Sequence, residues 1–193
     1  MDIKKQLYDY AVDVAQRVVK SDFDMLEAIV KRLIQAKIDG KTIYTAGNGG
    51  SAATASHTCN DLVKGCRVDD KVGFRAVCLA DSNAIVTCLA NDFCYEEIFS
   101  IQLKTFAQKG DVLVAFSGSG NSPNIISALK TARETGVDTI GFSGRDGGKM
   151  KELCDLLLIA PTDSMEQIED MHMLYEHAMV CSIKEILAEI QMP

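Results

Sequence analysis

The pattern of apolar and polar positions changes near residue 40. Residues 1–39 contain no Gly or Pro. Their apolar residues recur at steps of three and four, which is typical of amphipathic helices. Ser21 interrupts this pattern and is a residue type that caps helices. We therefore expect two leading helices over residues 1–40, whose apolar faces serve core packing and contacts between subunits.

Beyond residue 40, short and nearly continuous apolar runs alternate with helical stretches. The runs expected to form strands are residues 41–46, 74–80, 111–117, 138–143 and 155–160. Continuous apolar character is typical of strands covered on both faces. Alternation with helical stretches such as residues 121–136 predicts a parallel sheet in an α/β sandwich. A long last helix is expected over residues 164–190.

Composition and charge narrow the class of protein. The 193 residues contain no repeat, low-complexity segment or linker, which fits a single domain over residues 1–193. The formal net charge of −7 argues against nucleic acid or an anionic membrane as a partner, but allows a small anionic ligand. Seven cysteines without a C-x-x-C pair are expected to be small, reduced core residues. No apolar run matches a membrane span or a signal peptide, so we expect a cytoplasmic protein.

The first predicted strand leads directly into the stretch GNGGSAATASH, residues 47–57. Glycines let the backbone turn sharply and bring N–H groups close to a ligand, and the following helix adds the positive end of its dipole. The spacing matches neither a dinucleotide-binding loop nor a Walker loop, so no nucleotide cofactor is expected. We expect an anion-binding turn here, to which Ser51 adds a hydroxyl.

The third predicted strand leads into a second loop of this kind, SGSGNSPN, residues 117–124. Ser117, Ser119 and Ser122 can surround an anion with hydroxyls, and such a neutral nest suits a phosphate that must leave again with the product. Each loop by itself could be only a turn with a helix cap. Because ligands of parallel sheets bind at the carboxyl ends of strands, the two loops together predict one phosphate site.

Ionisable side chains follow the first loop and occupy the last helix. His57 and Asp61 are four residues apart and share a helix face, so they can hold one metal ion or orient one substrate. An ordinary surface pair is the alternative. Glu169 and His177 are about 80° apart around the last helix, whereas His172 points about 140° away from His177. We therefore expect His172 to be structural.

Together these motifs resemble those of sugar isomerase (SIS) domains, and they are most similar to the phosphoheptose isomerases, which isomerise sedoheptulose 7-phosphate. The resemblance covers essentially the whole chain and extends to LANDFCYEEIFS (89–100), GFSGRDGGKM (141–150) and IEDMHMLYEH (168–177). It implies a three-layer, flavodoxin-like sandwich with a five-stranded parallel sheet. It also implies a homotetramer whose active sites are built from neighbouring subunits.

The resemblance further implies an activity and a set of site residues. The activity is aldose–ketose isomerisation of a phosphorylated sugar through a cis-enediol, with Asp61 and His177 as the acid–base pair. The expected substrate contacts are Asn48, Gly49, Gly50, Ser51, Asp92, Ser117, Gly118, Ser119, Ser122 and Glu169. The positions that bind zinc or transfer protons in the family are matched by His57, Asp61, Glu169 and His177, which implies one Zn²⁺ per subunit.

Several positions depart from the pattern of the family. Asp61 stands where glutamate is usual, Glu169 where glutamine is expected, Glu166 where aspartate is usual, and Gly65 where an arginine is expected. A shorter carboxylate at position 61 has to be repositioned to reach the substrate carbon. Three hypotheses therefore stay open: an isomerase of sedoheptulose 7-phosphate, an isomerase of another anionic sugar, and a non-catalytic sugar-phosphate sensor or scaffold.

Overall fold

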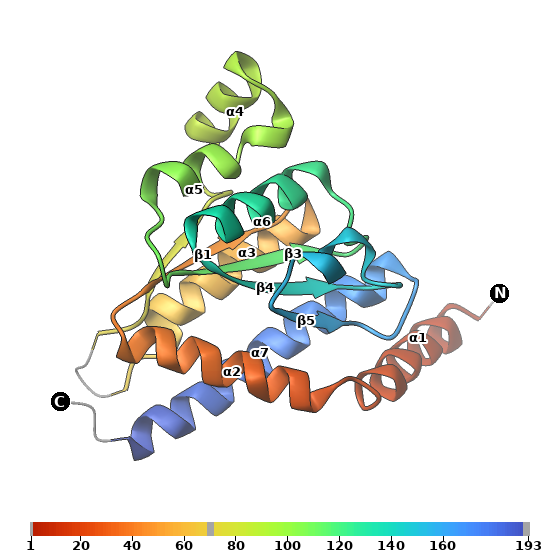
Figure 1. The fold of residues 1–193 in the computed structure, drawn as a ribbon. Helices are drawn as coiled ribbons and strands as arrows, with labels where there is room; N and C mark the ends of the chain where they lie inside the picture. Colours follow the sequence, from red (N-terminus) through yellow and green to blue (C-terminus); the bar gives the residue numbers. More distant parts are fainter. Residues whose placement is uncertain (1, 69–71, 191–193) are drawn as a thin grey trace.

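A computed structural model describes residues 2–68 and 72–190. Its centre is one parallel sheet of five strands in the order β2-β1-β3-β4-β5 (Figure 1). The strands are β1 (Thr42–Ala46), β2 (Arg75–Cys78), β3 (Val112–Ser117), β4 (Asp138–Ser143) and β5 (Leu156–Ile159). Each predicted apolar run contains one of these strands, so the predicted parallel sheet is confirmed.

The α-helices of the described residues are α1 (Ile3–Val18), α2 (Phe23–Ile38), α3 (Gly50–Asn60), α4 (Asn83–Asp92), α5 (Ser100–Phe106), α6 (Pro123–Thr135) and α7 (Met165–Glu189). Helices α1 and α4 extend away from the sheet, whereas the other helices cover its two faces (Figure 1). One core forms where α2, α3 and α7 pack on the sheet, and a second core forms under α5 and α6. Along β3, Val114 and Phe116 belong to the first core and Leu113 to the second, as the alternation of strand side chains requires. The three-layer architecture is therefore confirmed (Figure 1).

The two leading helices form where they were predicted, but their boundary differs by one residue. Asp22, and not Ser21, caps α2, because its side chain accepts a hydrogen bond from the Met25 N–H. Ser21 instead lies 2.5 Å from the hydroxyl of Tyr175 on α7, measured between the two oxygens. The residue that was expected to be the cap, Ser21, thus attaches this junction to the last helix.

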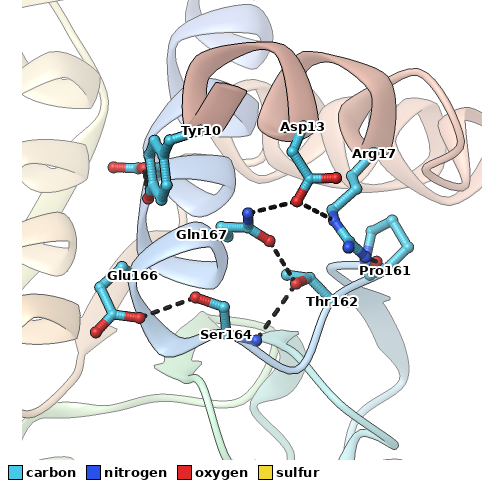
Figure 2. Close-up of polar contacts among 9 residues, drawn as sticks. Tyr10, Asp13, Arg17, Pro161, Thr162, Ser164, Glu166 and Gln167 are labelled. Carbon is cyan, nitrogen blue, oxygen red and sulfur yellow. Dashed lines mark hydrogen bonds and ion pairs between the residues drawn. The ribbon is translucent and has the colours of Figure 1, made fainter. Parts of the chain in front are cut away.

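Polar contacts attach α1 to the start of α7 (Figure 2). The Gln167 amide donates to Asp13 at 2.8 Å, and the Arg17 guanidinium donates to the same carboxylate at 2.9 Å. The carboxyl group of Glu166 accepts from the Ser164 hydroxyl, and its own backbone N–H and that hydroxyl lower its pKa. A carboxylate in the first turn of a helix also interacts favourably with the helix dipole.

Apolar side chains remain exposed on several helices, among them α1 and α4. Ile3, Leu7 and Tyr8 of α1 are exposed, and α4 has no buried residue at all. The expectation of core cysteines is correct for Cys66 and Cys78, and wrong for three of the others: Cys88, Cys94 and Cys181 are exposed, two of them on or beside α4. In the described part of the chain, no helix has the length and apolar character that crossing a membrane requires.

Candidate functional site

The two Gly/Ser loops leave the sheet side by side. Strands β1 and β3 are neighbours, with Ala46 paired to Ala115 at their carboxyl ends. The side-chain amides of Asn48 and Asn124 then join the loops, since each donates a hydrogen bond of 2.8 Å to the oxygen of the other. The hydroxyl of Tyr95 donates to the Asn48 oxygen at 2.9 Å. Asn124 and Tyr95 were not predicted, and they fix the relative position of the two loops.

A small pocket of about 150 Å³ lies between these loops. It is lined by Asn48, Ser51, Phe116, Ser117, Gly118, Ser119, Ser122, Met165 and Glu169. The Ser117 and Ser122 hydroxyl oxygens are 3.1 Å apart, and Ser51 is buried at the start of α3. Six of the predicted substrate contacts thus come from both loops to one pocket, together with Glu169 from α7. None of its lining residues is Lys or Arg, so hydroxyls and backbone dipoles are what it offers an anion.

Glycine is required where the first loop becomes α3. Gly49 is the N-cap residue and has a φ of 55°, a conformation that costs other residues energy. A Cβ atom at Gly50 would overlap the carboxylate of Glu169. The close approach of α7 to this turn therefore depends on the absence of a side chain at position 50.

A second group of polar side chains lies further along α3 and α7. The Nε2 atoms of His57 and His177 are 3.0 Å apart. The Asp61 carboxylate is 3.6 Å from His57 Nε2, and the Glu176 carboxylate is 3.8 Å from His57 Nε2 and 3.7 Å from His177 Nε2. One ligand atom from each of these four residues lies within 4.8 Å of all the others, an arrangement that can hold a metal ion.

Glu169 is the one predicted ligand that the structure does not bring to this group. It precedes Glu176 by seven residues, which is two helical turns or about 10 Å along α7. Gly50 precedes His57 by the same seven residues on α3. Because Gly50 meets Glu169 and His57 meets His177, the two helices run alongside each other in the same direction. Glu169 therefore lies at the level of the pocket, and Glu176 at the level of the histidines.

Glu176 was not predicted, and its environment is unusual. Its side chain is 0 % exposed, and neither carboxylate oxygen has a hydrogen-bond partner among the described residues. Burial and, to a smaller extent, the nearby charge of Asp61 raise the pKa of Glu176 to about 7, while Lys184 acts in the opposite direction. The sequence contained a clue to this burial. Glu176 lies three or four residues from His172, Met179 and Val180, so it shares the helix face of these buried residues.

Asp61 begins a turn of different geometry. Residues Asp61–Gly65 form a π-helical turn, in which the Cys66 N–H donates to the Asp61 carbonyl at 2.7 Å. A Cβ atom at Gly65 would come within 3.1 Å of the Asp61 carboxylate, so two of the departures from the family pattern lie against each other. Such turns often occur at functional sites, because the extra residue changes the direction of nearby side chains.

Two further predicted residues lie outside both groups. His172 is buried against Phe116 and Phe142, with its Nε2 3.1 Å from the Ser143 carbonyl oxygen, so its structural assignment is confirmed. Burial lowers the pKa of His172 to about 4. Asp92 ends α4 at the surface, where it accepts a hydrogen bond from the Asn91 amide at 2.8 Å, and it lines neither the pocket nor the metal-type group.

Comparison with known proteins identifies the family. The SIS domain model matches residues 6–144. A phosphoheptose isomerase of Aliarcobacter butzleri is 40 % identical over 167 residues, which cover 86 % of this chain and 87 % of that protein. The chain belongs to the phosphoheptose isomerase family of SIS-domain proteins. A second member of the family, from Clostridium acetobutylicum, is 37 % identical over 183 residues, which cover 93 % of this chain and 92 % of that protein.

Solved structures of the phosphoheptose isomerase family have the same fold. The enzyme from Neisseria gonorrhoeae superposes with a TM-score of 0.86 at 30 % identity, over 94 % of this chain and 96 % of that chain. The enzyme from Francisella tularensis superposes with a TM-score of 0.89 at 22 % identity, over 95 % of this chain and 97 % of that chain. The five-stranded sheet and its helical layers are therefore those of the family.

Proposed function

We propose that this protein is an aldose–ketose isomerase that converts sedoheptulose 7-phosphate into D-glycero-D-manno-heptose 7-phosphate. The observation that carries the proposal is the arrangement of two polar groups along α3 and α7: a hydroxyl-lined pocket at the start of the helices, and a His/Asp/Glu group two turns further on. Membership in the phosphoheptose isomerase family supports the same reaction.

The pocket is the proposed site of the phosphate. Hydroxyls of Ser51, Ser117, Ser119 and Ser122 donate to its oxygens, and the N-terminus of α3 adds backbone N–H groups and the positive end of its dipole. Hydrogen bonds from neutral donors to a charged acceptor are stronger than those to a neutral acceptor. The phosphate is therefore bound without a Lys or Arg among the lining residues, and it dissociates readily with the product.

The length of the substrate fits the distance between the two groups. Ser51 and His57 are six residues apart on α3, a rise of about 9 Å. An extended chain of seven carbons spans about 8 Å, which follows from standard bond lengths. With the phosphate at Ser51, the first two carbons lie at the level of His57 and Asp61. A three-carbon sugar phosphate falls short of that level, so the arrangement favours long sugars.

Asp61 and His177 are the proposed acid–base pair. One of them, as the base, removes the proton from the carbon next to the carbonyl. The C–H electron pair forms a C=C bond, and the carbonyl oxygen takes a proton from the other group, which gives a cis-enediol. The hydroxyl on the first carbon then loses its proton as its oxygen becomes the new carbonyl, and a proton that has exchanged with solvent is added to the former carbonyl carbon. The π-helical turn that starts at Asp61 supports this role, because such turns are frequent at functional sites.

We also propose that His57, Asp61 and His177 bind one Zn²⁺ per subunit. Two imidazoles and a carboxylate are a common donor set for zinc. The buried, unpartnered carboxylate of Glu176 beside them supports a cation at this place, because an uncompensated buried charge is costly. When bound, a divalent cation polarises the carbonyl oxygen of the sugar and so favours loss of the neighbouring proton.

A homotetramer is the proposed assembly, with residues 1–40 serving as a helical extension that packs between subunits. The exposed apolar residues of α1 and the absence of any buried residue in α4 support this proposal. Asp92 is then expected to contribute to the site of a neighbouring subunit, since it lies on α4, away from the pocket of its own chain. Light scattering coupled to gel filtration tests the assembly, and a monomer would contradict it.

The activity is tested by incubating the protein with sedoheptulose 7-phosphate in deuterated water and following the reaction by NMR. The proposal predicts formation of the heptose phosphate with deuterium at the carbon that receives the proton. Fructose 6-phosphate and dihydroxyacetone phosphate serve as shorter controls, and we expect slower turnover as the chain shortens. Binding of the heptose phosphate without turnover or exchange would instead indicate the sensor or scaffold hypothesis.

A further inference from the structure

The resemblance to the family assigned Glu169, and not Glu176, to the metal site. We infer that Glu176, and not Glu169, completes the metal site as the fourth ligand beside His57, Asp61 and His177. Helix α7 then supplies two consecutive ligands, Glu176 and His177. The inference extends the zinc part of the proposed function, but it is tested by metal binding and not by turnover.

The distances within the group suit a tetrahedral ion. Ligand atoms bound at zinc distances of about 2.0–2.1 Å are about 3.3 Å from one another in a tetrahedron. The two Nε2 atoms of His57 and His177 are 3.0 Å apart. The Glu176 oxygen is 3.8 and 3.7 Å from these two atoms, and the Asp61 oxygen is 3.6 Å from His57 Nε2. Shifts of a few tenths of an ångström bring these four distances to the tetrahedral value, and the other two pairs lie within 4.8 Å.

Burial explains why Glu176 needs a cation. Its ion-pair contacts within the described residues are to His57 and His177, at distances beyond hydrogen bonding, and both of its oxygens lack a hydrogen-bond partner. A buried carboxylate without compensation is costly, and partners or metal coordination are the usual forms of compensation. A divalent cation in contact with Glu176 and Asp61 is balanced by two negative charges, which leaves the site neutral.

The side chains of Glu176 and His177 leave one side of the site open. Glu176 is 0 % exposed and lies toward the core, whereas the side chain of His177 is 57 % exposed. An ion between them would have a carboxylate behind it and solvent in front. A sugar oxygen could approach from this open side as a fifth ligand, since zinc can expand to five-coordinate. Glu169 cannot replace Glu176, since it lies about 10 Å away along α7, beside Gly50.

The experiment compares Zn²⁺ binding in the full chain and in two matched variants, Glu176→Gln and Glu169→Gln. Both changes keep the size of the side chain and remove its charge, and they lie on the same helix. After removal of metal by a chelator, Zn²⁺ affinity is measured by competition with a chromophoric chelator. We expect Glu176→Gln to weaken binding by 10- to 100-fold, and Glu169→Gln to leave it within about twofold.

Thermal unfolding gives a second readout that a merely structural role would not produce. Without metal, Glu176→Gln is expected to melt at the same temperature as the unchanged chain or higher, because the uncompensated charge is gone. With Zn²⁺, the unchanged chain and Glu169→Gln gain melting temperature, and Glu176→Gln gains much less. If Glu176→Gln does not fold, Glu176→Met fills the same volume without polar groups and is measured in its place.

Three results would overturn the inference. They are unchanged Zn²⁺ affinity in Glu176→Gln, equal weakening in both variants, and no Zn²⁺ binding by the unchanged chain. The isomerase proposal fails separately, through absence of turnover of sedoheptulose 7-phosphate. A chain that binds Zn²⁺ through Glu176 but does not isomerise the sugar would keep this inference and remove the reaction.

Discussion

The two ends of the proposed site are built in opposite ways. At the start of α3 the pocket consists mainly of hydroxyls, amides and glycines beside the Glu169 carboxylate, and several of its polar groups are paired, such as the amides of Asn48 and Asn124. Two turns further along, four ionisable side chains crowd together, and the carboxylate of Glu176 has no hydrogen-bond partner among the described residues. The first end is largely a hydrogen-bonded network, whereas the second holds a buried carboxylate that no described side chain hydrogen-bonds.

This contrast separates binding from chemistry. A hydrogen-bonded network of hydroxyls and amides holds its shape without a ligand and binds an anion with little reorganisation. Crowded, uncompensated charge is costly for folding, and such clusters are typical of functional sites. Changes at the pocket should therefore act mainly on KM, and changes at the ionisable group mainly on kcat. Substitutions at each end can separate the two effects.

Asp61→Asn is expected to lower kcat by about 10³-fold with little change in KM, because it removes a proton acceptor and leaves the phosphate pocket intact. Steady-state kinetics with sedoheptulose 7-phosphate measure both constants. Deuterium exchange at the substrate carbon should fall in parallel. A variant that keeps more than a tenth of the activity would exclude Asp61 as the acid–base group.

Gly50→Ala is expected to lower kcat/KM by about 100-fold. The new Cβ overlaps the Glu169 carboxylate, so that either this carboxylate or the start of α3 must move. The double variant Gly50→Ala, Glu169→Ala provides the control, since it removes the group that the new methyl meets. Substantial recovery in the double variant, relative to Glu169→Ala alone, is expected. Equal loss with and without Glu169 would show that the close approach is not the cause.

Ser117→Ala is expected to raise KM roughly tenfold with kcat nearly unchanged, the usual effect of losing one hydrogen bond to a charged group. Ser127 on α6 is a matched control, since its hydroxyl donates to Glu97 and it does not line the pocket. Ser127→Ala should leave KM unchanged. A fall in kcat for Ser117→Ala, with KM constant, would contradict the division between the two ends.

The smallest predicted effect concerns His172, which lies outside both ends. Its pKa is lowered by burial to about 4, so the folded protein holds the neutral imidazole while the unfolded chain binds a proton from about pH 6.5 downward. Stability is therefore full above pH 6.5 and is lost as the pH falls toward 4. Between pH 7.5 and 5.5 we expect a loss of about 1 kcal/mol.

Urea unfolding at the two pH values measures this effect. His172→Gln serves as the comparison, because its amide cannot be protonated in this range. The difference in stability between the two pH values should be about 1 kcal/mol smaller in His172→Gln. The same pH dependence in both proteins would show that other groups cause it.

The sheet and the phosphate pocket could be predicted from the sequence because local pattern determines them. Strands buried on both faces are nearly continuous in apolar residues, and loops that approach a ligand need glycine, as Gly49 does with its positive φ. Ser21 was predicted as the cap of α2, whereas Asp22 is the cap. This error is small, because both residue types cap helices equally well.

It was harder to predict which residues make up the group of ionisable side chains, because this depends on which residues of α7 lie opposite which residues of α3. Glu169 and Glu176 are seven residues apart and so share nearly the same helix face. Helix phase alone cannot tell which of the two meets His57. Packing decides it, and the missed signal was the position of Glu176 among the buried residues of α7.

A crystal structure of Asp61→Asn with sedoheptulose 7-phosphate tests the proposed site most directly. We expect the phosphate between Ser51, Ser117, Ser119 and Ser122, with its oxygens within hydrogen-bond distance of the hydroxyls. We also expect the carbonyl end of the sugar beside residue 61 and His177. A phosphate bound elsewhere, or a sugar chain that runs away from the two histidines, would contradict the proposed site.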